Sequence, residues 1–472
     1  MIVANAVVKP LWVLGVDRKV QLQVGDEAFG NYMALLNLSM LFSALLDVGL
    51  TSFSNREIAR KPQKLQTYFA DMVGAKFILF GIYMLVLLGV GLIWRYSAQY
   101  LAMLALLGCL QFVTSMLLFM RSNVNGLQLF RTDALLSIAD KVIVILILGT
   151  MLLTPSLRQY VSIYTFVVVQ ILASAITILL SVALLNQHNT LRWPNISLSA
   201  LRQRLSVSFP VAIAIFLMFV YSKVDLFLLE RLHTDGALQS GLLQKCYRVL
   251  DALNMVGFMF ATLLLGLFSK MLHEQQGMQP IVKLSSSLLL PAACCASALL
   301  MWQAPLVLQT LYGNSDAMLV EAFRYIVLCF PALCLVSIYS TLVTANSDMK
   351  KLAGVAAIGS VICIVGNLIF AAKHGYIATA RIAFVTLNIV GILYAYSCTN
   401  VLGNKFLHRQ MLGYLLCMAA ALAANYFMQG ANVSFMVSFI ITCVLGLAMW
   451  YALGVFSANG TSRLRQMFAS KL

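Results

Sequence analysis

Residues 7–60 read VVKPLWVLGVDRKVQLQVGDEAFGNYMALLNLSMLFSALLDVGLTSFSNREIAR, two long apolar segments separated by the polar turn GDEAFG. Similar apolar runs continue through the chain, whose composition is 61% hydrophobic and only 10% charged, with a mean hydropathy of +0.90. A helix of about 20 apolar residues crosses the roughly 30 Å core of a bilayer. The 472 residues are therefore predicted to form a polytopic membrane protein.

The spans are predicted to be helices, because the runs are continuously apolar and do not alternate as the strands of a membrane barrel do. The N-terminus lacks the charged region and cleavage site of a signal peptide, so the first run is expected to be retained. Fourteen transmembrane helices are predicted, at 2–24, 31–50, 72–94, 100–120, 134–153, 160–185, 207–229, 241–268, 281–303, 320–344, 351–372, 376–398, 409–429 and 432–456.

The distribution of basic residues predicts the orientation. With the N-terminus inside, inner loops and flanks hold eighteen Lys and Arg, against four in the outer loops (Arg95, Arg158, Arg231 and Lys373). Cytoplasmic loops of membrane proteins carry such an excess. Both termini are therefore expected in the cytoplasm, and the localisation expected is a bacterial inner membrane. The net charge of +16 reflects this topology, and no nucleic-acid partner is expected.

The pattern of breaks predicts an all-α architecture of six, six and two helices. The longest polar stretch, 186–206, looks like a cytoplasmic linker on the membrane surface. It separates an N-lobe at 1–185 from a C-lobe at 207–398, and residues 399–472 supply two further helices and a basic tail. Repeated helical halves are typical of secondary transporters, which handle substrate between them.

Several basic residues lie inside the predicted spans, where a cation is costly unless it has a partner or faces a wet cavity. Ten of the 32 Lys and Arg are embedded, more than the embedded acidic residues, so a net positive cavity is expected. Five are predicted to bind an anionic substrate in one central cavity: Lys9, Arg18, Lys19, Lys223 and Arg248. Three carboxylates, Asp17, Asp225 and Asp251, are expected to hold these cations between substrates or to couple transport to H⁺ or Na⁺.

Two simpler interpretations stay open. A long side chain near a span end can lift its charged head into water, which is expected of Lys76 on the inner side. An ion pair that only stabilises the bundle is the other alternative. Arg248 and Asp251 lie three apart on one helical face, and Lys223 lies near Asp225.

The sequence contains none of the catalytic or nucleotide-binding motifs that would indicate a membrane enzyme or ATP drive. It has no GK[ST] phosphate loop, no GxSxG and no HExxH. The ten cysteines and five histidines show no metal-ligand spacing, and no cofactor is expected. A glycan polymerase or ligase is the alternative of another class, but the outer loops are short. A transporter is favoured over an enzyme.

Three stretches resemble the polysaccharide-transporter branch of the multidrug/oligosaccharidyl-lipid/polysaccharide (MOP) exporter superfamily. They are residues 7–60, APLVLQTLYGNSDAML at 304–319, and NLIFAAKHGYIATA at 367–380, where Arg381 departs from the family pattern. In the first stretch the matching residues are Gly25, Phe29, Gly30, Tyr32, Asp47, Gly49, Leu50, Arg56, Ile58 and Ala59.

The resemblance implies a MATE-like flippase fold, with two six-helix lobes around a V-shaped cavity and two extra helices. It implies export of an undecaprenyl-pyrophosphate-linked oligosaccharide. This oligosaccharide would be the repeat unit of a capsule or of the O-antigen of lipopolysaccharide. The expected partners are this lipid, the bilayer and polysaccharide polymerase or assembly proteins. A lipid II flippase and a multidrug exporter of the same superfamily are the alternatives, and the KPLW…GVDRK opening favours the O-antigen branch.

Overall fold

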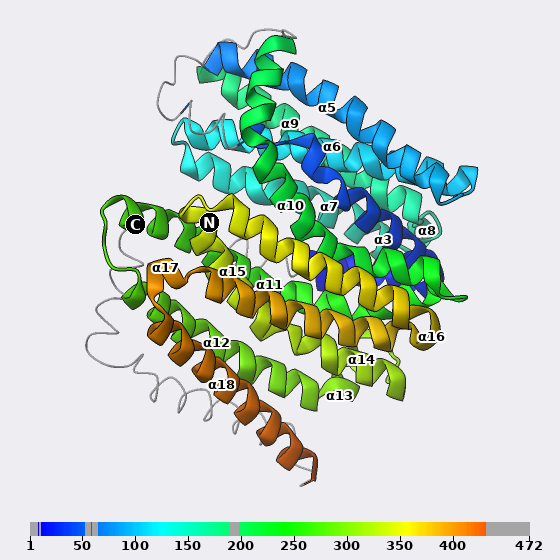
Figure 1. The fold of residues 1–472 in the computed structure, drawn as a ribbon. Coiled ribbons are helices and arrows are strands. Elements are labelled where there is room, and N and C mark those ends of the chain that lie inside the picture. Colours follow the sequence, from blue (N-terminus) through cyan, green and yellow to red (C-terminus); the bar gives the residue numbers. More distant parts are fainter. Residues whose placement is uncertain (1–7, 9–10, 52–57, 59–64, 189–197, 431–472) are drawn as a thin grey trace. The chain divides into compact units, whose positions relative to one another are not determined.

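The computed structural model describes residues 8, 11–51, 58, 65–188 and 198–430, and within them every regular element is a helix (Figure 1). The chain forms two compact units, residues 1–244 and 245–472, and each is described by itself. The all-helical class predicted from the sequence is confirmed. The predicted lobe and linker boundaries stay a prediction.

The core of the N-terminal unit lies between its long helices. Phe119 packs with Met72 and Leu79 in one buried apolar cluster, and α3 packs against both α6 and α10. The elements of this unit, in chain order, are η1 (Leu11–Asp17), α2 (Arg18–Val24), α3 (Asp26–Leu41), η2 (Ser43–Leu46), α5 (Leu65–Ile93), α6 (Ala98–Gly126), α7 (Phe130–Leu153), α8 (Pro155–Arg158), α9 (Ile163–His188) and α10 (Leu198–Leu232).

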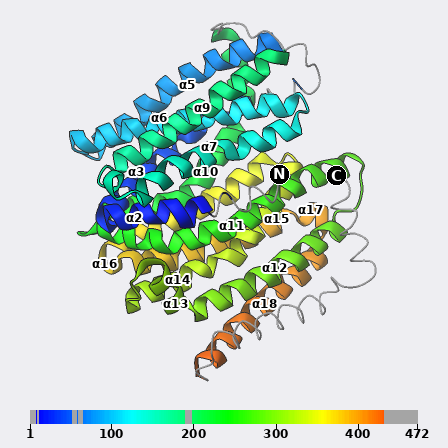
Figure 2. The ribbon, with the colours of Figure 1, turned by 180° about the vertical axis from the view of Figure 1, so that it is seen from behind.

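The boundary between the two units falls inside one continuous helix, α11. The first residues of α11 belong to the N-terminal unit, and the rest belong to the C-terminal unit. In this unit α12 packs against α15 and α18, and Figure 2 shows α12 beside α18. The elements are α11 (Gly236–His273), α12 (Gln279–Trp302), α13 (Ala304–Tyr312), α14 (Ala317–Val327), α15 (Cys329–Ala345), α16 (Met349–Ser397), α17 (Thr399–Leu402) and α18 (Asn404–Gly430).

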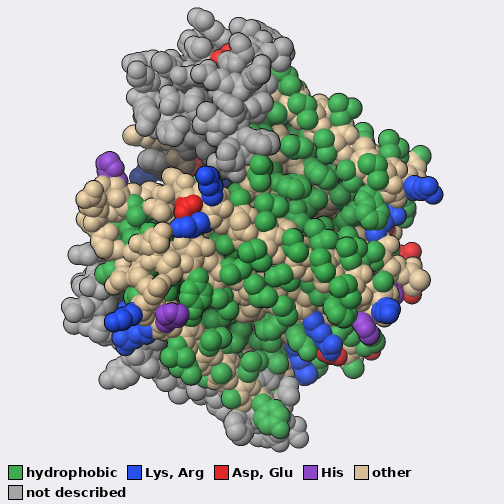
Figure 3. All heavy atoms as spheres, in the orientation of Figure 1, with side chains coloured by type: hydrophobic (Ala, Val, Ile, Leu, Met, Phe, Trp, Pro, Cys, Tyr) green, Lys and Arg blue, Asp and Glu red, His purple; other side chains and the backbone are tan. Residues whose placement is uncertain are grey.

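The helices turn apolar side chains outward, as expected of a protein whose solvent is lipid. Leu85 and Ile93 on α5 are 77% and 79% exposed, and hydrophobic side chains cover much of the described surface in Figure 3. Within the described ranges, nine helices are long and apolar enough to cross a membrane. The count of fourteen stays a prediction, because the last predicted span, 432–456, lies outside the described residues.

One of these helices, α16, is a hairpin of two spans. Its 49 residues would extend about 74 Å if straight, more than twice the thickness of a bilayer core. The helical conformation breaks at Gly375, where φ is 59° and ψ is −145°. A Cβ on Gly366 would lie 3.0 Å from Ile382, so the two arms pack against each other. The break predicted between 372 and 376 is confirmed.

The second predicted span, 31–50, is an α-helix only as far as Leu41, which corrects its inner end. It continues as the 3₁₀ segment η2 and a turn that begins at Asp47. The Ser43 hydroxyl donates to the Met40 carbonyl at 2.6 Å, and serines that bond their own backbone compete with a regular helix.

A pair of glycines allows α3 and the first turns of α11 to touch through their backbones. A Cβ on Gly30 would lie 1.8 Å from the Ala237 carbonyl oxygen, and one on Gly241 would lie 1.9 Å from the Asp26 carbonyl oxygen. No side chain fits at either position without separating the helices. The glycine of the FG motif in residues 25–30 is therefore a packing residue.

Candidate functional site

Three of the predicted site residues lie where the π-helix η1 gives way to α2. Asp17 is the last residue of η1, and Arg18 and Lys19 open α2. Val20 is fully buried on the same short helix, whereas Lys19 is exposed and Arg18 is half-buried. A π-helix of seven residues is rare, and such segments are frequent at functional sites. Lys9, predicted for the same site, lies outside the described residues.

The guanidinium of Arg18 is held with one nitrogen out of reach of solvent. Its Nε is buried and has no hydrogen-bond partner among the described residues, and Arg18 and Lys19 form no ion pair with any of them. A buried polar atom without a partner is costly, and such a group in a native structure calls for an explanation. A bound anion would supply the missing acceptor.

Lys223 and Asp225 lie on α10, in the middle of a membrane-spanning segment of the N-terminal unit. The Asp225 side chain is 4% exposed, and its Oδ1 accepts the Leu226 backbone N–H at 2.8 Å. Half-buried Lys223 makes no ion pair with a described residue. Residues two apart on a helix do not face each other, which explains why these two do not pair.

Arg248 and Asp251 lie on α11 in the C-terminal unit. Arg248 is 1% exposed, one of the largest fully buried side chains described, and Asp251 is half-buried. Arg248 interacts electrostatically with Tyr312 and with Asp251, which is one turn away on the same helix. The ion-pair alternative therefore stays open for Arg248.

Two other embedded cations, Lys76 and Lys141, have acidic partners, and sequence reasoning did not identify the partner of Lys76. Lys76 was expected to lift its head into water, and this was wrong. It is fully buried and donates to Asp47 Oδ1 at 2.8 Å and to Ser115 Oγ at 2.9 Å. Lys141 contacts its neighbour Asp140 at 3.2 Å. Both ammonium groups already have a carboxylate partner, so they are less able to bind an anionic ligand.

A second cluster of paired side chains lies between the loop after α5 and the end of α10. The Tyr96 hydroxyl donates to Glu230 Oε2 at 3.0 Å, and the Arg231 guanidinium lies 3.4 Å from the Tyr96 ring centre. Burial raises the pKa of the Tyr96 hydroxyl, which therefore stays protonated as a donor. Trp94 packs edge-on to Phe227 beside it. These contacts tie the loop after α5 to the end of α10.

Three of the predicted cations have no acidic partner among the described residues of the N-terminal unit: half-buried Arg18 and Lys223, and exposed Lys19. The helices that hold them, α2 and α10, both pack against α3. The single cavity predicted for all five cations stays a prediction, because Arg248 belongs to the other unit. In the described part of the chain, no group of three or more His, Cys, Asp or Glu is placed to hold a metal ion.

Comparison with known proteins gives a family model and a fold. A family model described as "Polysaccharide biosynthesis protein" matches residues 20–272. No curated protein sequence matches the chain.

Among solved structures, the lipid II flippase MurJ in an inward closed conformation has a TM-score of 0.71 at 14% identity, over 96% of this chain and 98% of MurJ. A MATE protein in complex with MaL6 has a TM-score of 0.59 at 13% identity, over 87% and 95%. An inward-facing MATE multidrug resistance transporter of the MOP superfamily has 0.58 at 12%, over 87% and 96%. At these identities the similarity shows the fold alone.

Proposed function

Because the chain belongs to the polysaccharide biosynthesis protein family, we propose that it is a flippase for undecaprenyl-pyrophosphate-linked oligosaccharide. The cargo would be an O-antigen or capsule repeat unit, moved from the inner to the outer leaflet of a bacterial inner membrane by alternating access. The relation to the MOP exporter superfamily, expected from residues 7–60, is confirmed by the family model and the fold. The chain is a multi-pass membrane protein, and both termini are proposed to be cytoplasmic.

The unpaired cations of the N-terminal unit are the observation that carries this proposal. A pyrophosphate has about two negative charges, which two or three cations neutralise in a low-dielectric site. Arg18, with its buried and unsatisfied Nε, would bind a phosphate through two N–H groups, and Lys19 and Lys223 would add positive field. Lys9 and Arg248, which the sequence also suggests as ligands of the substrate, stay predictions.

The membrane potential supports export in this direction. Moving one negative charge outward is favourable by about 2.3 kcal/mol per 100 mV when the cytoplasm is negative. No nucleotide is then required, and the return of the empty carrier would be coupled to H⁺ or Na⁺ through Asp17, Asp225 or Asp251. No covalent bond is made or broken in the proposed cycle.

Two relatives compete for the substrate. The similarity to MurJ fits lipid II as cargo. Lipid II and the lipid-linked repeat unit both carry a pyrophosphate, so the charge of the site does not distinguish between these two substrates. A MATE-like exporter of organic cations would need an acidic or aromatic site, and the proposed phosphate site with Arg18, Lys19 and Lys223 is neither. The family description favours a polysaccharide precursor over both alternatives.

The proposal is tested by following the lipid-linked pool. Cells that lack the protein should accumulate lipid-linked repeat units on the cytoplasmic face, and purified protein in vesicles should move these units between leaflets unchanged. New glycosidic product in the vesicles would indicate a polymerase or ligase. Transport of lipid II alone, or of organic cations alone, would replace the proposed cargo.

The site is tested with a matched pair of arginines. Arg18→Ala should abolish transport while the protein stays inserted and monodisperse, and Arg18→Lys should restore part of it. Arg381 is the control, because its ion pair with Glu321 is exposed and worth at most about 1 kcal/mol. Equal loss of transport in Arg18→Ala and Arg381→Ala would contradict the site.

A further inference from the structure

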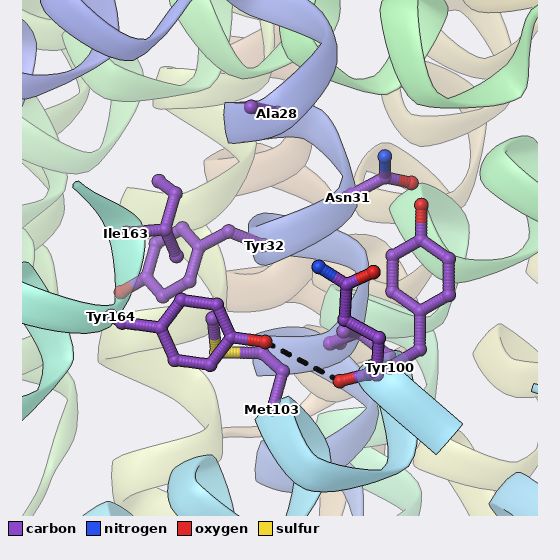
Figure 4. A pocket seen from close by; sticks show the side chains of 9 residues that line it. Ala28, Asn31, Tyr32, Tyr100, Met103, Ile163 and Tyr164 are labelled. Carbon is purple, nitrogen blue, oxygen red and sulfur yellow. Dashed lines mark hydrogen bonds between the residues drawn. The ribbon is translucent and has the colours of Figure 1, made fainter. Parts of the chain in front are cut away.

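A pocket opens in the N-terminal unit where α3, α6 and α9 begin (Figure 4). Its volume is about 180 Å³. In Figure 4 the rings of Tyr32 and Tyr164 lie on one side of it, and Asn31 and Tyr100 lie on the other. Gln99 adds a second carboxamide, and no charged residue lines the pocket. It is therefore separate in chemistry from the cationic site.

The aromatic rings of the pocket are held in place by their neighbours. Tyr32 is 4% exposed, and its ring lies 5.3 Å from the Phe29 ring and 5.6 Å from the Phe166 ring, edge-on in both cases. The Tyr164 hydroxyl donates to the Gln99 carbonyl oxygen at 3.5 Å. Tyr32 is thus a fixed wall of the pocket with little exposed surface, and the Tyr164 ring offers an apolar face to a ligand at a small ordering cost.

The carboxamides, in contrast, have free hydrogen-bonding capacity. Among the described residues, neither the Asn31 nor the Gln99 side chain has a hydrogen-bond partner. Each carboxamide carries both donors and an acceptor, and the Tyr100 hydroxyl can act as either. The pocket thus combines apolar ring faces with neutral groups that both donate and accept.

We propose that this pocket binds a sugar residue of the transported oligosaccharide. A pyranose has apolar C–H faces, which stack on tyrosine rings, and a rim of hydroxyls, which bond to carboxamides. The absence of charge disfavours pyrophosphate and suits a neutral glycan. The inference rests on the proposed function. The predicted topology places the starts of α3, α6 and α9 at the outer face, where an exported glycan emerges.

A competing explanation is that these tyrosines only anchor the helices at the membrane surface, where aromatic residues are enriched. Tyr160 provides the control for that role. It lies three residues before Ile163 in the same predicted outer segment, is 61% exposed, and does not line the pocket. If anchoring is the function, Tyr160 and Tyr164 are equivalent.

The test uses the oligosaccharide released by mild acid from the lipid-linked pool of cells that lack the protein. Binding to the purified full-length chain in detergent is measured by saturation-transfer NMR, which reports sugar C–H groups in contact with protein. The wild type should give transfer to ring protons. Tyr164→Ala and Asn31→Ala should each weaken binding by up to about tenfold, Tyr164→Phe by less than about threefold, and Tyr160→Ala should have no effect.

Each outcome has one interpretation. Absence of transfer to the wild type, or equal behaviour of Tyr160→Ala and Tyr164→Ala, overturns the sugar pocket. Tyr164 is 41% exposed, so its replacement leaves the core intact, and gel filtration checks this for each variant. Cells that accumulate no lipid-linked glycan would refute the proposed function together with the pocket. An accumulated glycan that does not bind would refute the pocket alone.

Discussion

The two partners of the buried ion pair in the N-terminal unit should respond very differently to substitution. Lys76 is fully buried, with its ammonium 2.8 Å from Asp47 Oδ1. Asp47→Asn leaves that ammonium in the interior with only neutral acceptors. An uncompensated buried charge costs about 3–5 kcal/mol. Ser115 Oγ at 2.9 Å and the Phe119 ring, 5.6 Å away, still contact the ammonium, so we expect a loss of about 3 kcal/mol.

The reverse substitution, Lys76→Met, should be mild. It removes the buried charge and replaces it with an apolar side chain of similar length. The Asp47 carboxylate that remains is 32% exposed and still accepts the Thr51 backbone N–H at 3.2 Å, so it stays solvated and bonded. The penalty for an uncompensated buried charge therefore does not apply to the carboxylate that remains. We expect a change of about 1 kcal/mol or less, and the double variant should recover most of the loss seen in Asp47→Asn.

The free energy of unfolding is measured by titrating SDS into mixed micelles and following helix content. Asp140→Asn is the control, because it breaks the less buried pair with Lys141 and should cost about 1 kcal/mol or less. Equal destabilisation by Asp47→Asn and Lys76→Met would refute the asymmetry. So would a double variant whose loss is the sum of the single losses, since it would show that the two groups are not coupled.

Four further substitutions test backbone geometry and hydrogen bonding. Gly30→Ala places a Cβ 1.8 Å from the Ala237 carbonyl oxygen and should destabilise by about 3 kcal/mol or prevent folding, seen as loss of monodisperse protein. Gly375→Ala forces an alanine to φ 59° and ψ −145° and should cost about 1–3 kcal/mol in the same SDS titration. Gly354→Ala, in the open helical part of α16, should be neutral or stabilising, and an equal loss there would contradict the strain. Tyr96→Phe removes a hydrogen bond to a carboxylate and should lower the free energy of unfolding by about 1.5–3 kcal/mol. This loss should appear as a lower thermal midpoint, with transport unchanged.

Helix boundaries could be predicted from the sequence where glycine decides them. The first described helix after the π segment ends at Val24, because Gly25 has φ 89°, and the hairpin breaks at Gly375. The inner end of the second span was not predictable in the same way. There, serine hydroxyls compete with backbone N–H groups for the backbone carbonyls. A hydropathy profile contains no information about this competition.

The site residues stay a prediction, and the partners of the embedded cations could not be predicted from the sequence. Sequence reasoning finds partners three or four residues away, so it paired Lys223 with a near neighbour and left Lys76 alone. The partner of Lys76 is 29 residues away on a different segment, and only the tertiary structure brings Asp47 to it. The distinction between paired and unpaired cations therefore required the structure.

The single-glycine break in α16 has a practical consequence for labelling. Two predicted spans are joined with no loop between them, so an epitope, a protease site or an inserted reporter at Gly375 would push apart arms that pack directly on each other. On the same predicted face, Gly313 has a left-handed backbone with open space around it, at the end of α13 and ahead of a short polar stretch. Surface tags for the C-terminal unit therefore belong at Gly313, and a failed tag at Gly375 would carry no information about topology.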